Sequence, residues 1–407
     1  MKKFLFSNIW IFTAFILGII ASKIPIPYIS TLAHGIMEIF VNLLKLISLP
    51  IIFFAIISTV TSMKSLKEAG FLLKKTLKYT LITTLIAATI GLLLFLFIDP
   101  AAQAVSSGAT NSPGTVLEGS YFSFLLKIIP SNPVQAFLDH NVLGVAFIAG
   151  ILSIAILQLP AKYQETVAPF FQGMFQALLK IASWVIRIIP IGIFGFTYYF
   201  MENLHSTQVH WENILLYALC VIGANLIQGL IILPLLLKIK GISPWRLAKA
   251  MSPALITAFF SKSSSATLPL ALENAEKRAK IPGKISSFSL PLCSIINMNG
   301  CAAFILITVL FVSISNGISF APVEWFAWIF ISTLAAIGNA GVPMGCYFLT
   351  GALLMSLNVN LDMLGIILPL YALFDMVETA LNVWSDSCVT ASVAKEIEAT
   401  ESLAVKT

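Results

Sequence analysis

Charged residues are scarce in this chain: Asp, Glu, Lys and Arg make up 10% of its 407 residues. Apolar residues make up 58%, and the mean hydropathy of +0.95 excludes an ordinary soluble domain. The five cysteines contain no CxxC pair, so they indicate neither a disulfide framework nor a zinc site. The net charge of +6 is spread over short connections between apolar runs, so nucleic acid is not implied as a partner.

The chain consists largely of long apolar runs that do not alternate as the strands of a membrane barrel would. About 20 apolar residues cross a bilayer as a helix. The runs therefore predict an all-α polytopic membrane protein. We expect the first run to be retained, because no small-residue cleavage site precedes SKIPIPYI. The expected spans are residues 6–24, 34–62, 72–98, 121–160 (interrupted), 166–200 and 210–238, followed by less regular blocks at 250–276, 285–314, 325–357 and 359–394.

Lysine and arginine gather in three connections, within residues 64–78, 238–249 and 277–284. The connection from Asp99 to Ser120 contains neither. By the positive-inside rule, we expect both termini and the basic connections to be cytoplasmic, and the connection at 99–120 to be external.

Two of the irregular blocks are apolar segments interrupted by small or polar residues: FFSKSSSATLP in 250–276 and AAIGNAGVPMG in 325–357. Each precedes an apolar run with polar residues, and Ser263 to Asn297 and Gly341 to Asp375 are both separations of 34 positions. Two hairpins of similar length that are not related by a repeat would also give two separations of 34 positions. The spacing favours an inverted repeat of two re-entrant hairpins, an arrangement that indicates a transporter's binding site.

Five polar residues in the last block are spaced 0, 3, 4, 7 and 11 positions apart, which places them on one face of a helix. A carboxylate facing lipid would cost a few kcal/mol. This face must therefore meet protein interior, a bound ion, a substrate or water. Ion pairs with other helices are the structural alternative, for which Lys262 is the main basic candidate within the membrane. We call these residues the polar stripe: Asp375, Glu378, Thr379, Asn382 and Asp386.

Three other motifs have chemistry that suits a binding site. The hydroxyls and free backbone N–H groups of SKSSSATLP favour an anion, although a serine-rich stretch is also typical of a flexible turn. GNAGVPMG frees backbone carbonyls, which suit a hard cation such as Na⁺. INMNG places Gly300 within a helical run, where glycine costs about 1 kcal/mol relative to alanine and favours a break.

Together these motifs resemble the dicarboxylate/amino acid:cation symporters, the glutamate transporter family. The similarity extends nearly from end to end, through LLKLISLPIIFFAIIS, IIPSNPVQAF and IPIGIFGF. Its most specific parts are SKSSSATLP, NMNG in place of the family's NMDG, GNAGVP, and DMVETALNVWSDSCVTASVAK.

The resemblance implies eight transmembrane helices plus two re-entrant helical hairpins, with inverted repeats and an elevator-type mechanism. It also implies a homotrimer in the bilayer of a bacterial inner membrane, with an amino acid substrate and Na⁺, and possible participation of H⁺. Residues 1–70 and 101–205 would form the scaffold and trimer contacts. Residues 71–100 and 206–395 would form the transport domain, and 396–407 a cytoplasmic tail.

Site residues follow from the resemblance by position. Asp375 and Thr379 would hold the substrate's α-amino group, and Asn382 with the serine run its α-carboxylate. The implied substrate set is Ser263, Ser264, Ser265, Met298, Cys301, Val342, Gly345, Cys346, Asp375, Glu378, Thr379 and Asn382. One implied sodium site comprises Asp386, Asn297, Asn382 and the Cys293 carbonyl, and another comprises Met298 with the backbone of Ala336, Ile337 and Asn339.

Glu378 is a departure from the family pattern, because members with acidic substrates have an arginine there. A carboxylate facing a carboxylate substrate would be repulsive in a pocket of low dielectric constant. An ionised Glu378 would instead pair with a basic substrate, and this interpretation is favoured. A protonated Glu378 would suit a neutral amino acid symporter or exchanger with proton participation. Cys301 and Cys346 also depart from the family's threonine and glycine.

Asn299 is a second departure, standing where NMDG has its acid. That acid belongs to a third sodium site, to which Thr83 and Thr84 would contribute. Without the charge we expect fewer coupled sodium ions and compensation by a proton, unless the amide oxygen itself ligates sodium. A channel or receptor on the same fold is the rival class. An enzyme is disfavoured because the four histidines lie away from the stripe.

Overall fold

The computed structural model describes residues 2–24, 26–61, 70–101, 129–139, 141–202, 211–339 and 344–404. Within these ranges all regular structure is helical and none is strand, which confirms the all-α prediction. The first half contains α1 (Lys2–Ser22), α2 (Pro27–Thr61), α3 (Gly70–Ile98), α6 (Pro133–Leu138), α7 (Val142–Gln158), α8 (Ala161–Arg187) and α9 (Ile189–Glu202). The second half contains α10 (Trp211–Ile227), the π-helix η1 (Gln228–Ile232), α11 (Leu233–Ile239), α12 (Pro244–Ser261), α13 (Ser264–Lys277), α14 (Gly283–Ile296), α15 (Asn299–Ser315), α16 (Pro322–Gly338), α17 (Gly345–Ser356) and α18 (Asp362–Ala404).

Four helical stretches of the described residues are long and apolar enough to cross a membrane: Leu72–Ile98, Trp211–Ile239, Gly283–Ser315 and Asp362–Glu398. Large apolar side chains on their outer faces, such as Phe97 and Leu230, are exposed, as expected where lipid replaces water. The count of eight spanning helices stays a prediction, because residues 102–128, which include part of the expected fourth span, lie outside the described ranges.

The predicted span at 166–200 is wrong as a single helix. It is divided between α8 and α9, with a turn at Ile188. Pro190 explains the break, because a proline has no backbone N–H, removes a hydrogen bond from the helical ladder and clashes with the carbonyl four positions earlier. This signal was present in the sequence.

Both predicted hairpin blocks are interrupted as expected. In the first, α12 and α13 pack together and meet at Lys262 and Ser263, where the Ser263 hydroxyl accepts a hydrogen bond from Ala266 N–H at 3.2 Å and caps α13. In the second, α16 ends at Gly338 and α17 begins at Gly345, while residues 340–343 lie outside the described ranges. The chain also breaks at Asn297 and Met298, between α14 and α15.

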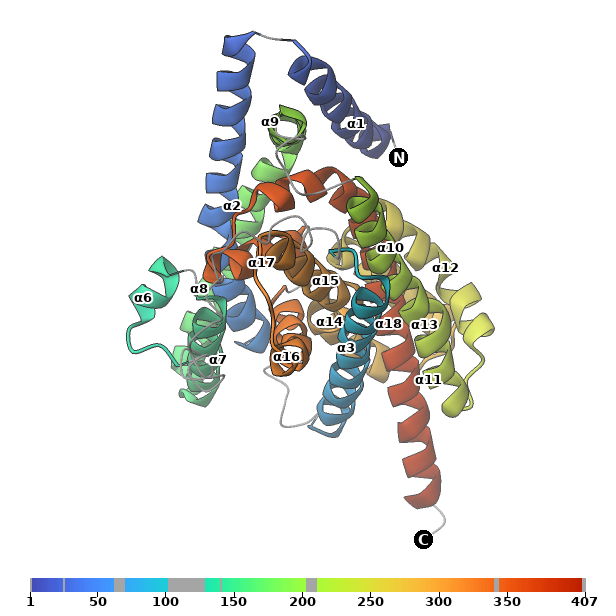
Figure 1. Cartoon of the computed structure of the whole chain (residues 1–407). Coiled ribbons are helices and arrows are strands. Elements are labelled where there is room, and N and C mark those ends of the chain that lie inside the picture. Colours follow the sequence, from blue (N-terminus) through green and yellow to red (C-terminus); the bar gives the residue numbers. More distant parts are fainter. Residues whose placement is uncertain are drawn as a thin grey trace.

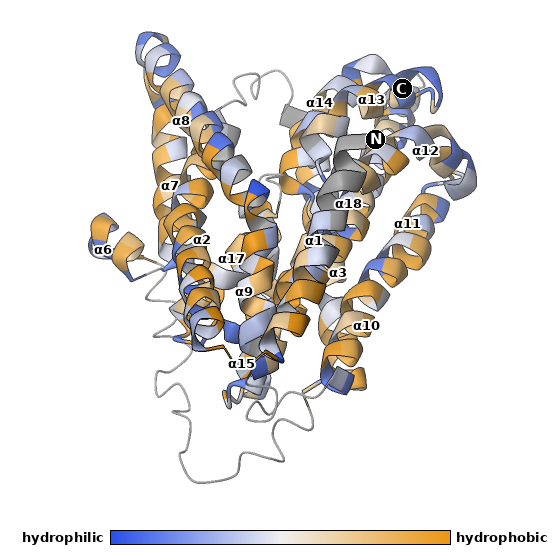
Figure 2. Cartoon of the chain, turned by 90° about the horizontal axis from the view of Figure 1, so that it is seen from above, coloured by the Kyte–Doolittle hydropathy of each residue, from blue (hydrophilic) through white to orange (hydrophobic). Residues whose placement is uncertain are grey.

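Helix α15 lies at the centre of one group of helices and is buried from Asn299 to Ser313 (Figure 1). It packs against α3, α10, α16, α17 and α18, and α18 also packs against α12 and α14. A second group is formed by α1, α2, α7, α8 and α9, in which α2 contacts α7, α8 and α9. Figure 2 shows α7 and α8 on one side of the molecule and α11, α12 and α18 on the other.

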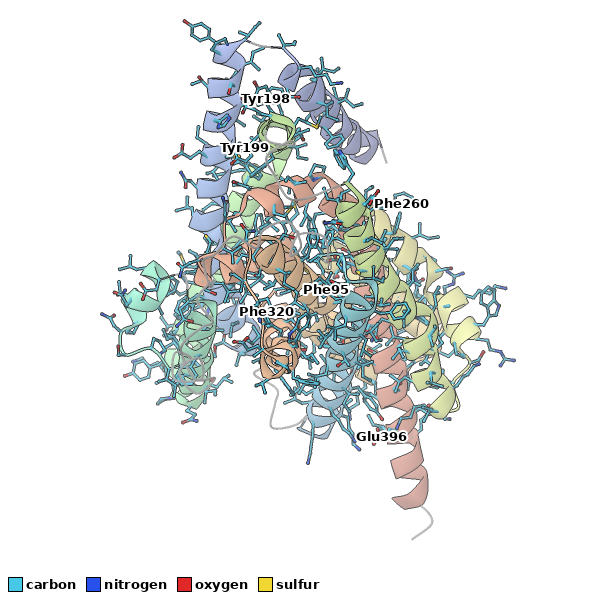
Figure 3. All side chains as sticks on the ribbon, in the orientation of Figure 1. Phe95, Tyr198, Tyr199, Phe260, Phe320 and Glu396 are labelled. Atoms are coloured by element: carbon cyan, nitrogen blue, oxygen red, sulfur yellow. A yellow bond between two sulfur atoms is a disulfide. The ribbon has the colours of Figure 1, made fainter. Side chains whose placement is uncertain are left out.

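Polar contacts at the two ends of α18 tie it to other helices. Glu396, labelled in Figure 3, forms an ion pair with Lys75 of α3 and accepts a hydrogen bond from the Tyr79 hydroxyl at 2.5 Å. At the other end, the Tyr199 hydroxyl of α9 donates to Asp362 at 2.8 Å. These contacts fix the axial position of the helix that carries the polar stripe.

Close packing of α9 on α2 depends on Gly195, and replacing it with alanine should destabilise the protein. An added Cβ would lie 2.9 Å from the Ala33 carbonyl oxygen and 3.0 Å from the Met37 nitrogen, both backbone atoms. Overpacking of this kind costs about 1–3 kcal/mol, which exceeds the helix-propensity gain of about 1 kcal/mol. Thermal unfolding in detergent should show a lower midpoint for Gly195→Ala. The control Gly150→Ala, whose Cβ would meet nothing within 4 Å, should unfold at the wild-type temperature or above it.

Candidate functional site

The polar stripe of α18 faces the protein interior. Asp375, Glu378, Thr379, Asn382 and Asp386 are 7%, 1%, 6%, 3% and 3% exposed. Because α18 packs against α12, α13, α14 and α15, three carboxyl groups are enclosed in the centre of the group of helices around α15. The predicted orientation of this helix, with its polar face away from lipid, is confirmed.

Asp375 is the first residue of the polar stripe along α18. Its carboxylate accepts a hydrogen bond from the Tyr371 hydroxyl at 3.4 Å, and its backbone carbonyl accepts one from the Thr379 hydroxyl at 2.7 Å. Lys262, at the tip between α12 and α13, is close enough for its charge to interact with that of Asp375. Lys262 adopts the left-handed conformation, with φ of 53°, that ends α12. The structure therefore places the predicted basic candidate within electrostatic range of Asp375.

Glu378 is the exception within the stripe. Both of its carboxylate oxygens are buried and have no hydrogen-bond partner. The close approach of α15 accounts for this enclosure, because a Cβ added to Gly300 would lie 2.9 Å from the Glu378 Cα atom. A buried carboxyl group without a partner is costly, so the burial of Glu378 has no explanation in the hydrogen bonds of the described residues.

Asp386 belongs to a network of amides and hydroxyls at the break between α14 and α15. The Asn297 amide donates to Asp386 and to the Ser385 hydroxyl, each at 2.9 Å. The Asn382 side-chain oxygen accepts from Gly300 N–H at 2.9 Å. The Cys293 carbonyl accepts from Asn297 N–H at 2.8 Å, which leaves it a second lone pair. These oxygens are the ligand type that Na⁺ requires, so the residues present fit a sodium ion.

Two of the residues expected for a third sodium site, Thr83 and Asn299, extend the same network. The Asn299 amide donates to Asn297 at 2.9 Å and to Ser385 at 2.5 Å, while the Thr83 hydroxyl donates to Asn297 at 3.2 Å. Thr84 is buried, but its hydroxyl donates to the Thr80 carbonyl of its own helix at 2.8 Å.

Gln228 completes this network and was missed by sequence reasoning. Its amide nitrogen donates to the Thr83 carbonyl and to the Asn299 side-chain oxygen, each at 3.0 Å. Gln228 begins the π-helix η1, which precedes Pro234. A proline removes a hydrogen bond from the helical ladder and favours such a bulge, so a polar residue one to two turns before a proline was the available signal.

Two sulfur atoms, those of Cys301 and Cys346, lie within 4.8 Å of the Glu378 carboxylate. Cys301 of α15 and Cys346 of α17 form a disulfide with a Cα–Cα distance of 5.4 Å, so the expectation that the cysteines indicate no disulfide is wrong for this pair. Its two half-cystines are 45 positions apart, which is why spacing did not reveal it. The Asn339 amide donates to the Cys301 and Cys346 sulfurs at 3.3 and 3.4 Å, and the Asn382 amide approaches the Met298 sulfur at 3.5 Å.

The remaining predicted residues belong to the two hairpins. Ser264 is buried at the start of α13, while the side chain of Ser265 lies outside the described part of the chain. Ala336 and Ile337 occupy the last turn of α16, where carbonyls lack helical partners, and the Ala336 carbonyl accepts from Asn339 N–H at 3.1 Å. Gly345 begins α17 and is buried, and Val342 lies outside the described residues.

Comparison with known proteins gives one consistent result. A model of the sodium:dicarboxylate symporter family matches residues 8–396. The human neutral amino acid transporter B(0) is 26% identical over 400 residues, covering 90% of this chain and 74% of the relative. The bovine protein of the same name is 27% identical over 383 residues, covering 86% and 71%. The proton/glutamate-aspartate symporter of Escherichia coli (strain K12) is 25% identical over 377 residues, covering 88% and 84%.

Proposed function

The chain belongs to the sodium:dicarboxylate symporter family, and from this we propose that it carries an amino acid across a membrane together with a cation. The family resemblance read from the motifs is confirmed, and members of the family are transporters rather than enzymes. The relatives are named for neutral amino acids and for glutamate and aspartate. Their names support an amino acid as the substrate class.

A cationic amino acid such as lysine, arginine or ornithine is the substrate that the site supports best. The observation that carries this proposal is Glu378, which is buried and has no partner for either carboxylate oxygen. Asp375, by contrast, already interacts with Tyr371 and Lys262. A basic substrate side chain one helical turn from Asp375 would supply the charge that Glu378 lacks.

A neutral amino acid is the second candidate. It is favoured by the named function of the human and bovine relatives. In this case Glu378 would hold a proton, and the carboxyl O–H would donate a hydrogen bond to the substrate or release its proton during transport. The name of the Escherichia coli relative, a proton symporter, gives precedent for proton coupling.

Sodium is the proposed coupling ion at Asp386. The carboxylate supplies the charge, and the side-chain oxygens of Asn297 and Asn382 and the second lone pair of the Cys293 carbonyl would complete the ligand set. Binding there would require the Asn297 amide to turn its oxygen towards the ion. The last-turn carbonyls of α16 at Ala336 and Ile337, with Asn339 and Met298, are the proposed second site.

The third sodium site of the family is proposed to be absent from this protein. Where a cation would need oxygen ligands, Asn299 and Gln228 present amide N–H groups to the oxygens of Thr83, Asn297 and Ser385. These donors satisfy the same oxygens that would otherwise ligate sodium. A proton carried elsewhere would then compensate for the missing charge.

Replacing Asn299 with the aspartate that the family has at this position should restore the third sodium site. Asn299→Asp places a carboxylate beside Thr83, so the sodium Hill coefficient for substrate binding should rise above that of the wild-type protein. Sodium titrations of both proteins would measure it, with Asn316→Asp, at the end of α15, as a control that leaves the coefficient unchanged. Equal coefficients for wild type and Asn299→Asp would mean that the amide ligates sodium as well as the acid does.

The division of labour between helices is also a proposal. The group formed by α1, α2, α7, α8 and α9 would be the trimeric scaffold, and the group around α15 and α18 the transport domain that moves as an elevator. The packing supports this division, because most contacts lie within each group. We propose a bacterial inner membrane as the location, with both termini cytoplasmic.

Uptake by proteoliposomes tests the proposed function. Purified protein would be reconstituted and supplied with labelled lysine, arginine, glutamine, serine and glutamate, with and without an inward sodium gradient. Sodium-dependent accumulation of basic amino acids is expected, with little glutamate uptake. Downhill flux that no ion gradient can drive uphill would instead identify a channel.

A further inference from the structure

Cys301 and Cys346 belong to the substrate set that the resemblance implies, but the disulfide between them has no part in the proposed transport. It joins the first turn of α15 to the first turn of α17, and both residues are 3% exposed or less. Cys346 directly follows the start of α17, after the left-handed residue Met344 at the end of the hairpin tip. The bond therefore attaches the second arm of this hairpin to the central helix.

The substrate site beneath this attachment is closed. The polar stripe is at most 7% exposed, so no substrate can reach Glu378 unless an element that covers it moves. Helix α17 is one such element, because it packs on α15 beside Glu378, whose carboxylate lies within 4.8 Å of both sulfurs. A disulfide keeps its two Cα atoms within about 7 Å of each other, so the first turn of α17 cannot leave α15 while the bond is intact.

We propose that Cys301 and Cys346 form a redox latch that holds the substrate site closed when oxidised and permits it to open when reduced. The proposal rests on the proposed transport function. Opening requires thiol–disulfide exchange with a small dithiol, which reaches the buried sulfurs when covering elements other than α17 move transiently. Its thiolate attacks one sulfur, and its second thiol then releases the mixed disulfide. Two electrons and two protons pass to Cys301 and Cys346, and the dithiol becomes a disulfide.

Reduction also changes the chemical groups next to the Glu378 carboxylate. Each of the two new thiols has an S–H group that can donate to the carboxylate oxygens, which have no partner in the oxidised form. Asn339, which contacts both sulfurs, would keep the thiols near each other for reoxidation. Two thiols and a carboxylate are also ligands for a thiophilic cation, so metal chelator must be present in every arm of the test.

The experiment compares the full-length protein purified without reductant with the same protein treated with dithiothreitol, both in EDTA. Thiol titration after denaturation defines the two states: three thiols, from Cys220, Cys293 and Cys388, are expected before reduction and five after it. Lysine binding and hydrogen exchange of the backbone amides in Gly345–Ser356 are then measured in each state. Reduction should strengthen lysine binding at least tenfold and accelerate exchange in α17.

Cys301→Ser and Cys346→Ser supply the matched variants, since neither can form the bond. Both should show fast exchange in α17 whether or not reductant is present, whereas Cys220→Ser, which keeps the disulfide, should respond as wild type does. Five thiols before reduction would overturn the latch. So would unchanged exchange and binding between the three-thiol and five-thiol forms. Accelerated exchange without binding of any amino acid in either form would support the latch and contradict the proposed function instead.

Discussion

Glu378→Gln should weaken the binding of lysine, arginine or ornithine at least tenfold. The glutamine keeps the shape of the side chain but removes the charge that a basic substrate would neutralise. Breaking a buried ion pair by removing one partner costs about 3–5 kcal/mol, and a tenfold loss corresponds to only about 1.4 kcal/mol. Competition binding with labelled lysine on reduced protein would measure the effect. The exposed residue Glu165 provides the matched control, because Glu165→Gln should bind lysine as the wild type does.

A second substitution reverses the charge at position 378. Glu378→Arg places a positive charge where a basic side chain would lie, so it should abolish the binding of basic amino acids. It should admit glutamate or aspartate only weakly, since Cys301 and Cys346 stand where acidic-substrate members have threonine and glycine.

Competition at two pH values separates the two substrate proposals. If Glu378 is protonated when it binds a neutral amino acid, the affinity for glutamine or serine should fall as the pH rises and the carboxyl group ionises. An ionised Glu378 paired with lysine should show the opposite preference. Displacement of label by neutral amino acids, with no displacement by basic ones, would contradict the basic-substrate proposal.

Asp386→Asn should weaken sodium-dependent substrate binding at least tenfold while leaving a folded oligomer. Asp386 is the one carboxylate in the network of Asn297, Ser385 and Asn382, so its replacement leaves a sodium ion with neutral ligands only. A desolvated cation without a counter-charge is costly by several kcal/mol. Sodium titration of lysine binding would measure the change, and size-exclusion chromatography would check the assembly.

The control for this change is Asp139→Asn, which replaces an exposed aspartate outside the group of helices around α15. It should leave the sodium titration unchanged. An Asp386→Asn protein with wild-type sodium affinity would remove Asp386 from the proposed sodium site.

The sequence alone determined the membrane location, the all-helical architecture, the two interrupted hairpin blocks and the inward orientation of the polar stripe. These features depend on local chemistry. Apolar length decides whether a helix can cross a bilayer, and the spacing of Asp375, Glu378 and Asp386 decides that they share a face, because a helix repeats every 3.6 residues. The cost of a carboxylate in lipid then turns that face inward without reference to any particular neighbour.

Only the tertiary structure decided which polar groups satisfy one another. Glu378 lacks a partner, whereas Asp386 has Asn297, because of how α14, α15 and α18 cross, and no spacing along one helix contains that information. The Gln228 contact with Asn299 joins residues 71 positions apart through a π-helix, and the disulfide joins residues 45 positions apart. Hydrogen bonds and disulfides act over a few ångströms, so their partners are chosen by packing between distant segments, and packing is a property of the folded chain.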